Sequence, residues 1–433
     1  MAGRNSRRTA AQIYRKTTLR NGLRIVTEKI PTVRSVSLGV WVDVGTRHET
    51  RAENGISHFV EHMLFKGTHR RTARQISGEL EAVGGSINAF TSREQTCFNA
   101  RVLDEHLDLA VDVLSDITCC STFTPENIRR EKQVILEEIK EAFETPSDRI
   151  HDEFAEVYWN GHPLGQPILG SAGNVAGFAR SRILEYVRRH YRAGSVVIAG
   201  AGNLSHDRLV RLVSEKFCFP KGRGEAPLPA ARPDVELLRL IEGGNAQTHL
   251  SLGYPGVPYD SPKKNAALAL NAYLGGGMSS VIFQKVRELK GLAYSVYTFA
   301  DFYRDTGMFG AYVGTDRAHV AGALEIIIAE MERMKRRKLP SLKFDPLKAQ
   351  LKGQIMLGME STSARMNRLA RQELYLGRFI PFAETLASME RLTPFDLLEF
   401  ANESFDRSQL TVVTLGPAPH RRLREVTGAG AKR

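Results

Sequence analysis

The chain has 433 residues, of which 42% are hydrophobic and 25% charged, and this is the composition of a folded protein with room for more than one domain. No apolar run approaches the roughly 18 residues of a membrane span, and the basic, acid-free first 27 residues lack the apolar core of a signal peptide. The net charge of +12 is dispersed and accompanies no recognition motif. We therefore expect a cytoplasmic protein without a nucleic-acid or membrane partner.

Cysteine usage indicates neither a disulfide framework nor a zinc finger. Cys97, Cys119, Cys120 and Cys218 show no C-x-x-C or Cys/His spacing. We expect all four to be reduced and mainly buried thiols.

The first strong periodicity lies at residues 35–46, where one face is apolar. It predicts a β-strand, and that face carries Val36, Leu38, Val40, Val42 and Val44.

The segment that follows has the pattern H-x-x-E-H at His58, Glu61 and His62, the reverse of the commoner H-E-x-x-H zinc-peptidase signature. On a helix, the two histidines lie one above the other and Glu61 falls on the same arc. Apolar neighbours surround the helix, so these ionisable groups must be paired or bind a metal. A self-satisfied polar cluster is the alternative. Two histidines and a carboxylate leave one zinc coordination position for water, as hydrolysis requires.

Residues 125–143 form a second predicted helix, which offers the remaining ligand. Glu131 and Glu138 are two turns apart and lie beside the apolar face, whereas Glu137 points to the opposite side. Buried carboxylates are costly unless they bind something. The helix therefore predicts Glu138 as third ligand and Glu131 as the carboxylate that orients a ligand histidine. The apolar face itself consists of Ile128, Ile135, Ile139 and Ala142.

The second half of the chain repeats the organisation of the first. Residues 248–254 alternate like residues 35–46, a glycine-rich turn at 275–277 leads into a helix over 278–290, and residues 405–416 resemble 191–200. This duplication predicts two similar domains, of which only the first carries the metal. The expected boundaries are a zinc-binding catalytic domain at 14–221, a linker at 222–234, a metal-free homologous domain at 235–417 and a flexible basic tail at 418–433.

Several motifs in order resemble the pitrilysin/insulinase-type zinc peptidases, in particular the bacterial two-domain subfamily similar to the mitochondrial processing peptidase. The resemblance spans about residues 14–415 of the chain. It rests on HFVEHMLFKGT (58–68), GGSINAFTSREQT (84–96), REKQVILEEIKE (130–141), HPLGQPILG (162–170) and GGGMSSVIFQKVRELKGLAYSV (275–296).

The resemblance implies a fold and a set of roles. The fold is α+β, an α/β sandwich, with two tandem homologous domains of the LuxS/mitochondrial-processing-peptidase-like metallohydrolase type. In the family pattern His58, His62 and Glu138 match the ligands of one zinc ion per chain, Glu61 matches the general base, and Glu131 matches the supporting glutamate.

The family pattern also implies substrate-binding residues. Arg287 and Tyr294 match a pair that binds substrate and stabilises the oxyanion, although spacing alone favours a surface arginine and a packed tyrosine. Residues 84–91 match an edge strand to which the substrate backbone adds, with Asn88 and Ala89 as the expected contacts. An ordinary hairpin strand is the alternative.

The predicted function is that of a zinc metalloendopeptidase that cleaves oligopeptides or unfolded segments in a chamber formed by a homodimer. In such a dimer, Arg287 and Tyr294 would complete the zinc site of the partner. A processing peptidase that removes presequence-like N-terminal extensions is the first alternative. A non-catalytic scaffold subunit is the second, and the intact set of His58, Glu61, His62, Glu131 and Glu138 disfavours it.

Overall fold

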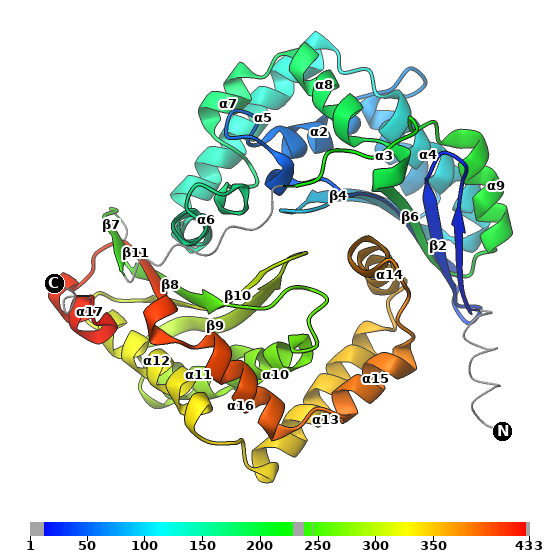
Figure 1. Ribbon diagram of the computed structural model, residues 1–433. Helices are drawn as coiled ribbons and strands as arrows, with labels where there is room; N and C mark the ends of the chain where they lie inside the picture. The colour runs from blue at the N-terminus through cyan, green and yellow to red at the C-terminus, as the bar shows by residue number, and fades with distance from the viewer. Residues whose placement is uncertain (1–12, 228–237, 245, 430–433) are drawn as a thin grey trace, which may run out of the picture. The chain divides into compact units, whose positions relative to one another are not determined.

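The computed structural model describes residues 13–227, 238–244 and 246–429 (Figure 1). They form two compact units, each with one β-sheet covered by helices. Unit 1 takes its described residues from 1–139, 166–228 and 356–381, and unit 2 from 140–165, 229–355 and 382–433. Neither unit is therefore a continuous stretch of sequence.

Unit 1 is built on a six-stranded sheet with the order β1-β2-β6-β3-β5-β4. Strands β2 and β6 are parallel, and all other neighbours are antiparallel. Strand β4 lies at one edge and pairs only with β5 among the described strands. The strands are β1 (Tyr14–Thr18), β2 (Arg24–Lys29), β3 (Ser35–Val42), β4 (Ser86–Thr91), β5 (Thr96–Leu103) and β6 (Val196–Gly202).

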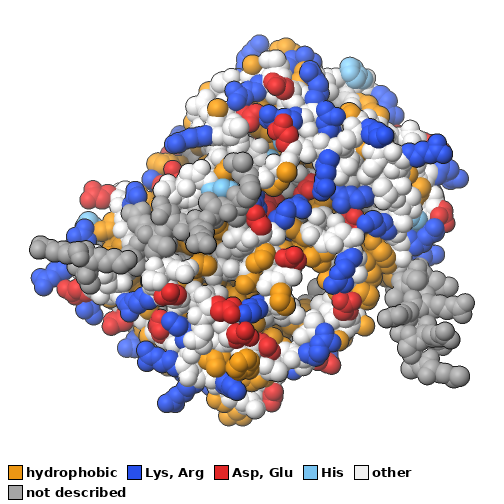
Figure 2. Space-filling model, in the orientation of Figure 1, with side chains coloured by type: hydrophobic (Ala, Val, Ile, Leu, Met, Phe, Trp, Pro, Cys, Tyr) orange, Lys and Arg blue, Asp and Glu red, His pale blue; other side chains and the backbone are white. Residues whose placement is uncertain are grey.

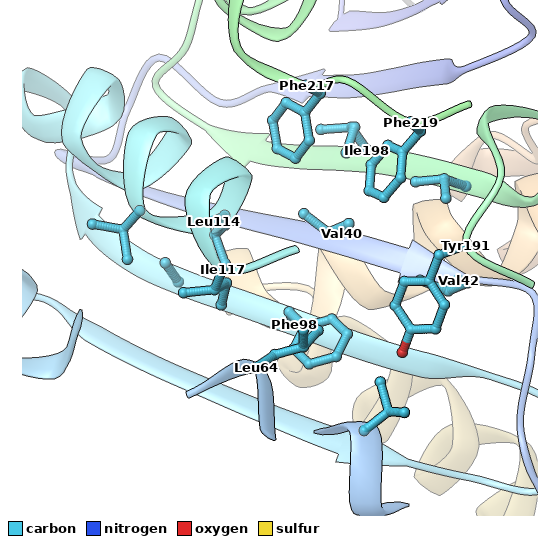
Figure 3. Close-up of a cluster of buried hydrophobic side chains, with 14 of the residues drawn as sticks. Val40, Val42, Leu64, Phe98, Leu114, Ile117, Tyr191, Ile198, Phe217 and Phe219 are labelled. Carbon is cyan, nitrogen blue, oxygen red and sulfur yellow. The ribbon is translucent and has the colours of Figure 1, made fainter. Parts of the chain in front are cut away.

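One face of this sheet forms the main core of unit 1. Figure 3 shows part of it, where Val40 and Phe98 of the sheet face Leu114 and Ile117 of helix α4. Burial of such apolar side chains contributes roughly 1.5–3 kcal/mol each. The helices of the unit are α2 (Ile56–Leu64), α3 (Ala73–Glu81), α4 (Leu107–Cys120), α5 (Pro125–Glu144, up to Ile139), α7 (Ala172–Gly177), α8 (Arg180–His190), α9 (His206–Lys216) and α14 (Thr362–Leu376), with short 3-10 turns η1 (Thr46–His48), η2 (Asp104–His106) and η4 (Ala193–Ser195).

The opposite face of the same sheet is covered by α14, which comes from the second half of the chain. Trp41 of β3 is fully buried there and donates from Nε1 to Sδ of Met366 at 3.2 Å. A side chain at Gly39 would meet that sulfur at 2.6 Å, so glycine lets the helix approach. The strand predicted at residues 35–46 is confirmed over Ser35–Val42 as β3, whereas Thr46 already belongs to η1. β3 is buried on both faces because α14 packs on the second.

Unit 2 repeats this architecture with a five-stranded sheet of order β7-β11-β8-β10-β9. Only β7 and β11 are parallel. The strands are β7 (Arg239–Ile241), β8 (Thr248–Pro255), β9 (Ala293–Phe302), β10 (Gly307–Thr315) and β11 (Thr411–Leu415). The helices are α6 (Pro146–Tyr158), α10 (Lys264–Gly275), α11 (Val281–Phe283), α12 (Val320–Arg336), α13 (Ser341–Gly358, up to Ile355), α15 (Phe382–Glu390), α16 (Pro394–Ser404) and α17 (His420–Thr427), with 3-10 turns η3 (Pro163–Gly165) and η6 (Arg407–Gln409) and the π-helical segment η5 (Gln284–Leu289).

The helix that covers the second face of this sheet is α6, from the first half of the chain. Its Phe154 and Tyr158 pack with Met308 and Val413 of strands β10 and β11. Each half of the chain thus contributes one helix to the sheet formed by the other half. This exchange is a property of the observed units, and the sequence boundaries 14–221 and 235–417 stay a prediction.

Two predicted segments differ from the structure or lie outside it. The tail at 418–433 was expected to be flexible, but residues 420–427 form α17, because Leu423 is fully buried and packs with Val426 against the core of unit 2. Most of the linker at 222–234 lies outside the described residues. The helix predicted over 278–290 begins only at Val281 and continues as the π-helical η5.

The surface carries charges of both signs. On the face shown in Figure 2, lysine and arginine side chains are dispersed among acidic ones. Within the described part of the chain, none of the helices combines the length and apolar character needed to cross a bilayer.

Candidate metal centre and catalytic residues

Helix α2 carries the H-x-x-E-H residues, and its start is stabilised by a buried carboxylate. Gly55 occupies the N-cap in the left-handed conformation with φ of 98°, so no side chain can cap the helix from that position. Glu49 replaces the cap: its Oε2 accepts from the backbone N–H of Gly55 at 2.8 Å and its Oε1 from that of Ser57 at 2.8 Å. Asn54 Nδ2 donates to Oε2 as well, at 3.1 Å. This cap holds the turn that precedes His58.

The segment 166–170 supports the same turn. A side chain at Gly55 would meet Cα of Gly170 at 2.8 Å, so two glycine backbones are in direct contact. Asn54 Nδ2 also donates to the carbonyl of Pro167 at 2.9 Å. Through these contacts, the end of the HPLGQPILG stretch stabilises the turn that precedes α2.

The two histidines of α2 meet a carboxylate of α5. Nε2 of His58 and Nε2 of His62 lie 3.8 Å and 3.6 Å from Oε2 of Glu138. The ligand atoms of these three residues all lie within 4.8 Å of one another, and within residues 13–227, 238–244 and 246–429 they form the one such group of three metal-ligating side chains. The structure thus brings the three predicted ligands together.

The donor set fits a zinc ion. With bonds of about 2.0–2.2 Å, two ligands of a tetrahedral zinc lie roughly 3.4 Å apart, close to the observed separations of Nε2 from Oε2. Two imidazoles and one carboxylate with room for a fourth ligand are the donors of a hydrolytic zinc site.

Glu131 contacts His62 and Lys66 and is not part of the group of three side chains. Its Oε2 accepts a hydrogen bond from Nδ1 of His62 at 3.1 Å, and Lys66 Nζ lies 3.0 Å from Oε1. Burial raises the pKa of Glu131, but the hydrogen bonds from His62 and Lys66 outweigh burial and lower it below the usual value. The ionised carboxylate fixes the proton of His62 on Nδ1, which leaves Nε2 free to bind a metal.

Glu61 is held beside the three ligands by a residue of the edge strand. Oγ1 of Thr91, the last residue of β4, donates to its Oε2 at 2.6 Å. Burial raises the pKa of Glu61, the Thr91 hydrogen bond and His62 lower it, and the Glu138 carboxylate raises it further, so that the net shift is upward. A carboxylate with a raised pKa next to a candidate metal site has the property expected of a general base.

His58 is neutral over most of the pH range. Burial and then the neighbouring His62 lower its pKa from 6.5 to about 4. Its Nδ1 is buried and has no hydrogen-bond partner among the described residues. The neutral ring keeps the Nε2 lone pair available to a cation.

The predicted backbone-binding residues lie on β4. Asn88 is exposed, and its Oδ1 accepts a hydrogen bond from the backbone N–H of Ala89 at 2.8 Å. Because β4 is an edge strand, one side of its backbone has no strand partner in the described structure, as addition of an extended peptide requires.

Arg287 and Tyr294 belong to unit 2, where they contact each other. Nη1 of Arg287 donates to the carbonyl of Tyr294 at 2.9 Å, and its guanidinium lies 4.5 Å from the centre of the tyrosine ring. Arg287 is in the π-helical η5, a conformation frequent at functional sites. The Tyr294 side chain is 78% exposed, so its hydroxyl is accessible. The packed tyrosine that spacing alone favoured is therefore wrong.

Three residues that support the site were not singled out from the sequence: Thr91, Lys66 and Glu49. Thr91 belongs to the GGSINAFT stretch, and a hydroxyl side chain at the expected end of this strand was the feature that could have identified it. Glu49 could have been identified because the buried helix begins at a glycine, which has no side chain to cap it, so that another residue must do so. No local pattern identifies Lys66.

Most of the chain is similar in sequence to known proteins. A model of the insulinase family, peptidase family M16, matches residues 24–172, and a model of the peptidase M16 inactive domain matches residues 177–351. An uncharacterized zinc protease of Streptomyces coelicolor is 39% identical over 414 residues, which cover 93% of this chain and 89% of the relative. One of Bacillus subtilis is 41% identical over 367 residues, covering 84% and 89%.

The fold is shared as well. The crystal structure of a protease from Helicobacter pylori superposes with a TM-score of 0.88 at 21% identity and covers 93% of this chain and 99% of that one. This match confirms the predicted fold class of mixed helices and sheets in two domains, and the sequence matches confirm the predicted resemblance. The chain belongs to the insulinase family of peptidases, family M16.

Proposed function

We propose that the chain is a zinc metalloendopeptidase that hydrolyses peptide bonds of oligopeptides or unfolded segments. The observation that carries the proposal is the convergence of Nε2 of His58, Nε2 of His62 and Oε2 of Glu138 next to the carboxylate of Glu61. The zinc protease names of the two bacterial relatives support it.

The residues of the candidate site have separate chemical roles. His58, His62 and Glu138 would hold one zinc ion, which when bound supplies Lewis-acid catalysis for peptide hydrolysis. Glu61 accepts a proton from the attacking water and delivers it to the leaving amine. The raised pKa of Glu61 makes its carboxylate a stronger base toward the attacking water than an ordinary glutamate.

Substrate binding is assigned to the edge strand β4 and to the pair of Arg287 and Tyr294. An extended peptide adds to β4 through main-chain hydrogen bonds at Asn88 and Ala89, which suits broad specificity. The guanidinium of Arg287 and the hydroxyl of Tyr294 bind substrate and stabilise the negative oxygen that develops during attack.

The assembly we propose is a homodimer that encloses a chamber. In it, Arg287 and Tyr294 of one copy serve the zinc site of the other. Mixed dimers of Glu61→Gln and Tyr294→Phe, each inactive alone, should then regain activity in about one site per mixed dimer. A lack of recovery after verified subunit exchange would assign each site to a single chain.

The central test pairs zinc analysis with cleavage of a quenched peptide library. Wild-type protein should contain about one zinc per chain and cleave unstructured peptides. Glu61→Gln should retain zinc and lose turnover, whereas Glu81→Gln, at an exposed position at the end of α3, should change neither. Cleavage by Glu61→Gln at the wild-type rate would refute the assigned base. Cleavage confined to presequence-like extensions would instead identify a processing peptidase.

Two neighbouring glutamates of α5, Glu137 and Glu138, provide a matched test of the ligand assignment. Glu138→Gln should lose zinc on dialysis, while Glu137→Gln should retain it, because Glu137 is exposed on the same helix. Full zinc occupancy in Glu138→Gln would remove Glu138 from the ligand set.

A further inference from the structure

Three of the four cysteines lie together on unit 1, although the sequence separates them widely. Cys119 and Cys120 end helix α4, and Cys218 follows helix α9. The backbone N–H of Cys218 donates to Sγ of Cys119 at 3.4 Å across 99 residues of chain. The thiols of both Cys119 and Cys120 are close enough to that of Cys218 to lower its pKa.

The contact is held in place by the core. Phe217 and Phe219, on either side of Cys218, are buried, and their rings stack with centroids 5.9 Å apart. In Figure 3 both belong to the same apolar cluster as Leu114 and Ile117 of α4. Cys218 itself is exposed. Its backbone is therefore fixed against the end of α4 while its sulfur remains accessible to small oxidants.

We propose that Cys218 and Cys119 form an oxidisable dithiol that hydroperoxides convert into an intramolecular disulfide. The Cys218 thiolate attacks the peroxide, so that an S–O bond forms as the O–O bond breaks. The departing hydroxide (or alkoxide) takes up the proton that Cys218 released to solvent on ionising, and a sulfenic acid and one water (or alcohol) result. The Cys119 thiol then attacks this sulfur, and an S–S bond forms as the S–O bond breaks. The departing hydroxide takes the Cys119 proton and leaves as a second water. Two thiols are oxidised by two electrons in total, and one peroxide is reduced.

The electrostatics suit this order of attack. The neighbouring Cys119 thiol lowers the pKa of the Cys218 thiol to about 6, while the Cys218 thiol and burial raise the pKa of Cys119. Cys218 is thus the thiolate and Cys119 the proton-bearing resolving thiol. Cys97 provides an internal contrast, because complete burial raises its pKa and keeps peroxide away.

A bridge at this position would stabilise the fold around the metal centre. The loop it closes, residues 119–218, contains all of α5 and therefore Glu131 and Glu138. Ser121, two residues after Cys119, donates from Oγ to the carbonyl of Leu64, the last residue of α2. Closing a loop of about 100 residues restricts the unfolded chain strongly. The oxidised protein should therefore unfold at a temperature several degrees higher, with its zinc and peptide cleavage retained.

Mass spectrometry of the full-length, zinc-loaded protein tests the proposal. Reduced protein is treated with hydrogen peroxide, blocked with N-ethylmaleimide and digested with trypsin. The expected product joins the peptide 217–221 to the peptide 102–129, with fragment ions that place the bridge on Cys119 and with Cys97 alkylated. Cys119→Ser should lose the bridge, the thermal shift and the resolving step, so that dimedone traps a sulfenic acid on Cys218. Cys120→Ser should keep both the bridge and the thermal shift.

Several results would overturn it. These are a wild-type bridge through Cys120 or Cys97, oxidation of Cys218 to sulfinic acid without any bridge, or no reaction of Cys218 at peroxide concentrations that oxidise free cysteine. The fragment ions of the wild-type protein decide the partner even where a serine variant folds poorly.

Discussion

Oγ1 of Thr91 donates a 2.6 Å hydrogen bond to Oε2 of Glu61. This bond joins the last residue of the edge strand β4 to the helix that carries the candidate metal ligands. A peptide that adds to β4 would therefore contact the strand that holds the proposed base, so substrate position and base position are coupled through one hydroxyl.

Removal of this hydroxyl should raise the pKa of Glu61. The Thr91 bond stabilises the ionised carboxylate, and a hydrogen bond to a charged group contributes about 1.5–3 kcal/mol. In Thr91→Val, the acidic limb of the kcat/KM profile should move up by roughly one to two pH units. Thr91→Ser keeps the donor and should show the wild-type profile. An unshifted limb in Thr91→Val would mean that Glu61 does not set it.

Loss of the Glu131 carboxylate should weaken metal binding without abolishing it. Glu131 touches His62 and Lys66 rather than the ligand atoms of the centre, and removal of such partners typically lowers metal affinity 10- to 100-fold, an order-of-magnitude expectation. Competition with a fluorescent zinc chelator should show this loss for Glu131→Gln. Glu137→Gln on the exposed side of the same helix serves as the control, and equal affinity of the two variants would contradict the role of Glu131.

The zinc-free protein should lose stability as the pH falls from 6.5 to about 4. In this interval the unfolded chain binds a proton at His58 that the folded chain does not bind, since the pKa is lowered to about 4 in the fold. Unfolding therefore becomes easier at lower pH, by about 3 kcal/mol over the interval. Urea titrations of EDTA-treated protein should show a shallower pH dependence in His58→Gln. His69→Gln, at an exposed position, should keep the wild-type slope.

The buried cap at Glu49 should contribute strongly to folding. Its carboxylate accepts two backbone N–H groups at the start of α2, and the Glu49→Ala variant would leave both unsatisfied in the interior. We expect a loss of about 2–4 kcal/mol in unfolding free energy, measured by urea denaturation, and a lower zinc affinity because His58 follows this turn. Glu81→Ala provides an exposed control, and equal stability of the two variants would exclude the capping role.

Local periodicity allowed part of this structure to be predicted from the sequence. The spacing of His58 and His62 and the position of Glu138 on the edge of an apolar helix face depend only on the geometry of a single helix turn or two. The same holds for the alternation that predicts β3 and β8. Such patterns can be recognised without knowing which elements pack together, because each element must present one apolar face to a core.

Contacts between distant segments were decided by the tertiary structure alone. The bond from Thr91 to Glu61 and the contact of Cys218 with Cys119 join residues 30 and 99 positions apart, and such separations carry no period. The exchange of α6 and α14 is of the same kind. The sequence by itself thus determined which residues could bind a metal and on which elements they lie. Packing decided which other side chains orient or restrain these candidate ligands, because hydrogen bonds and thiol contacts depend on distance in space.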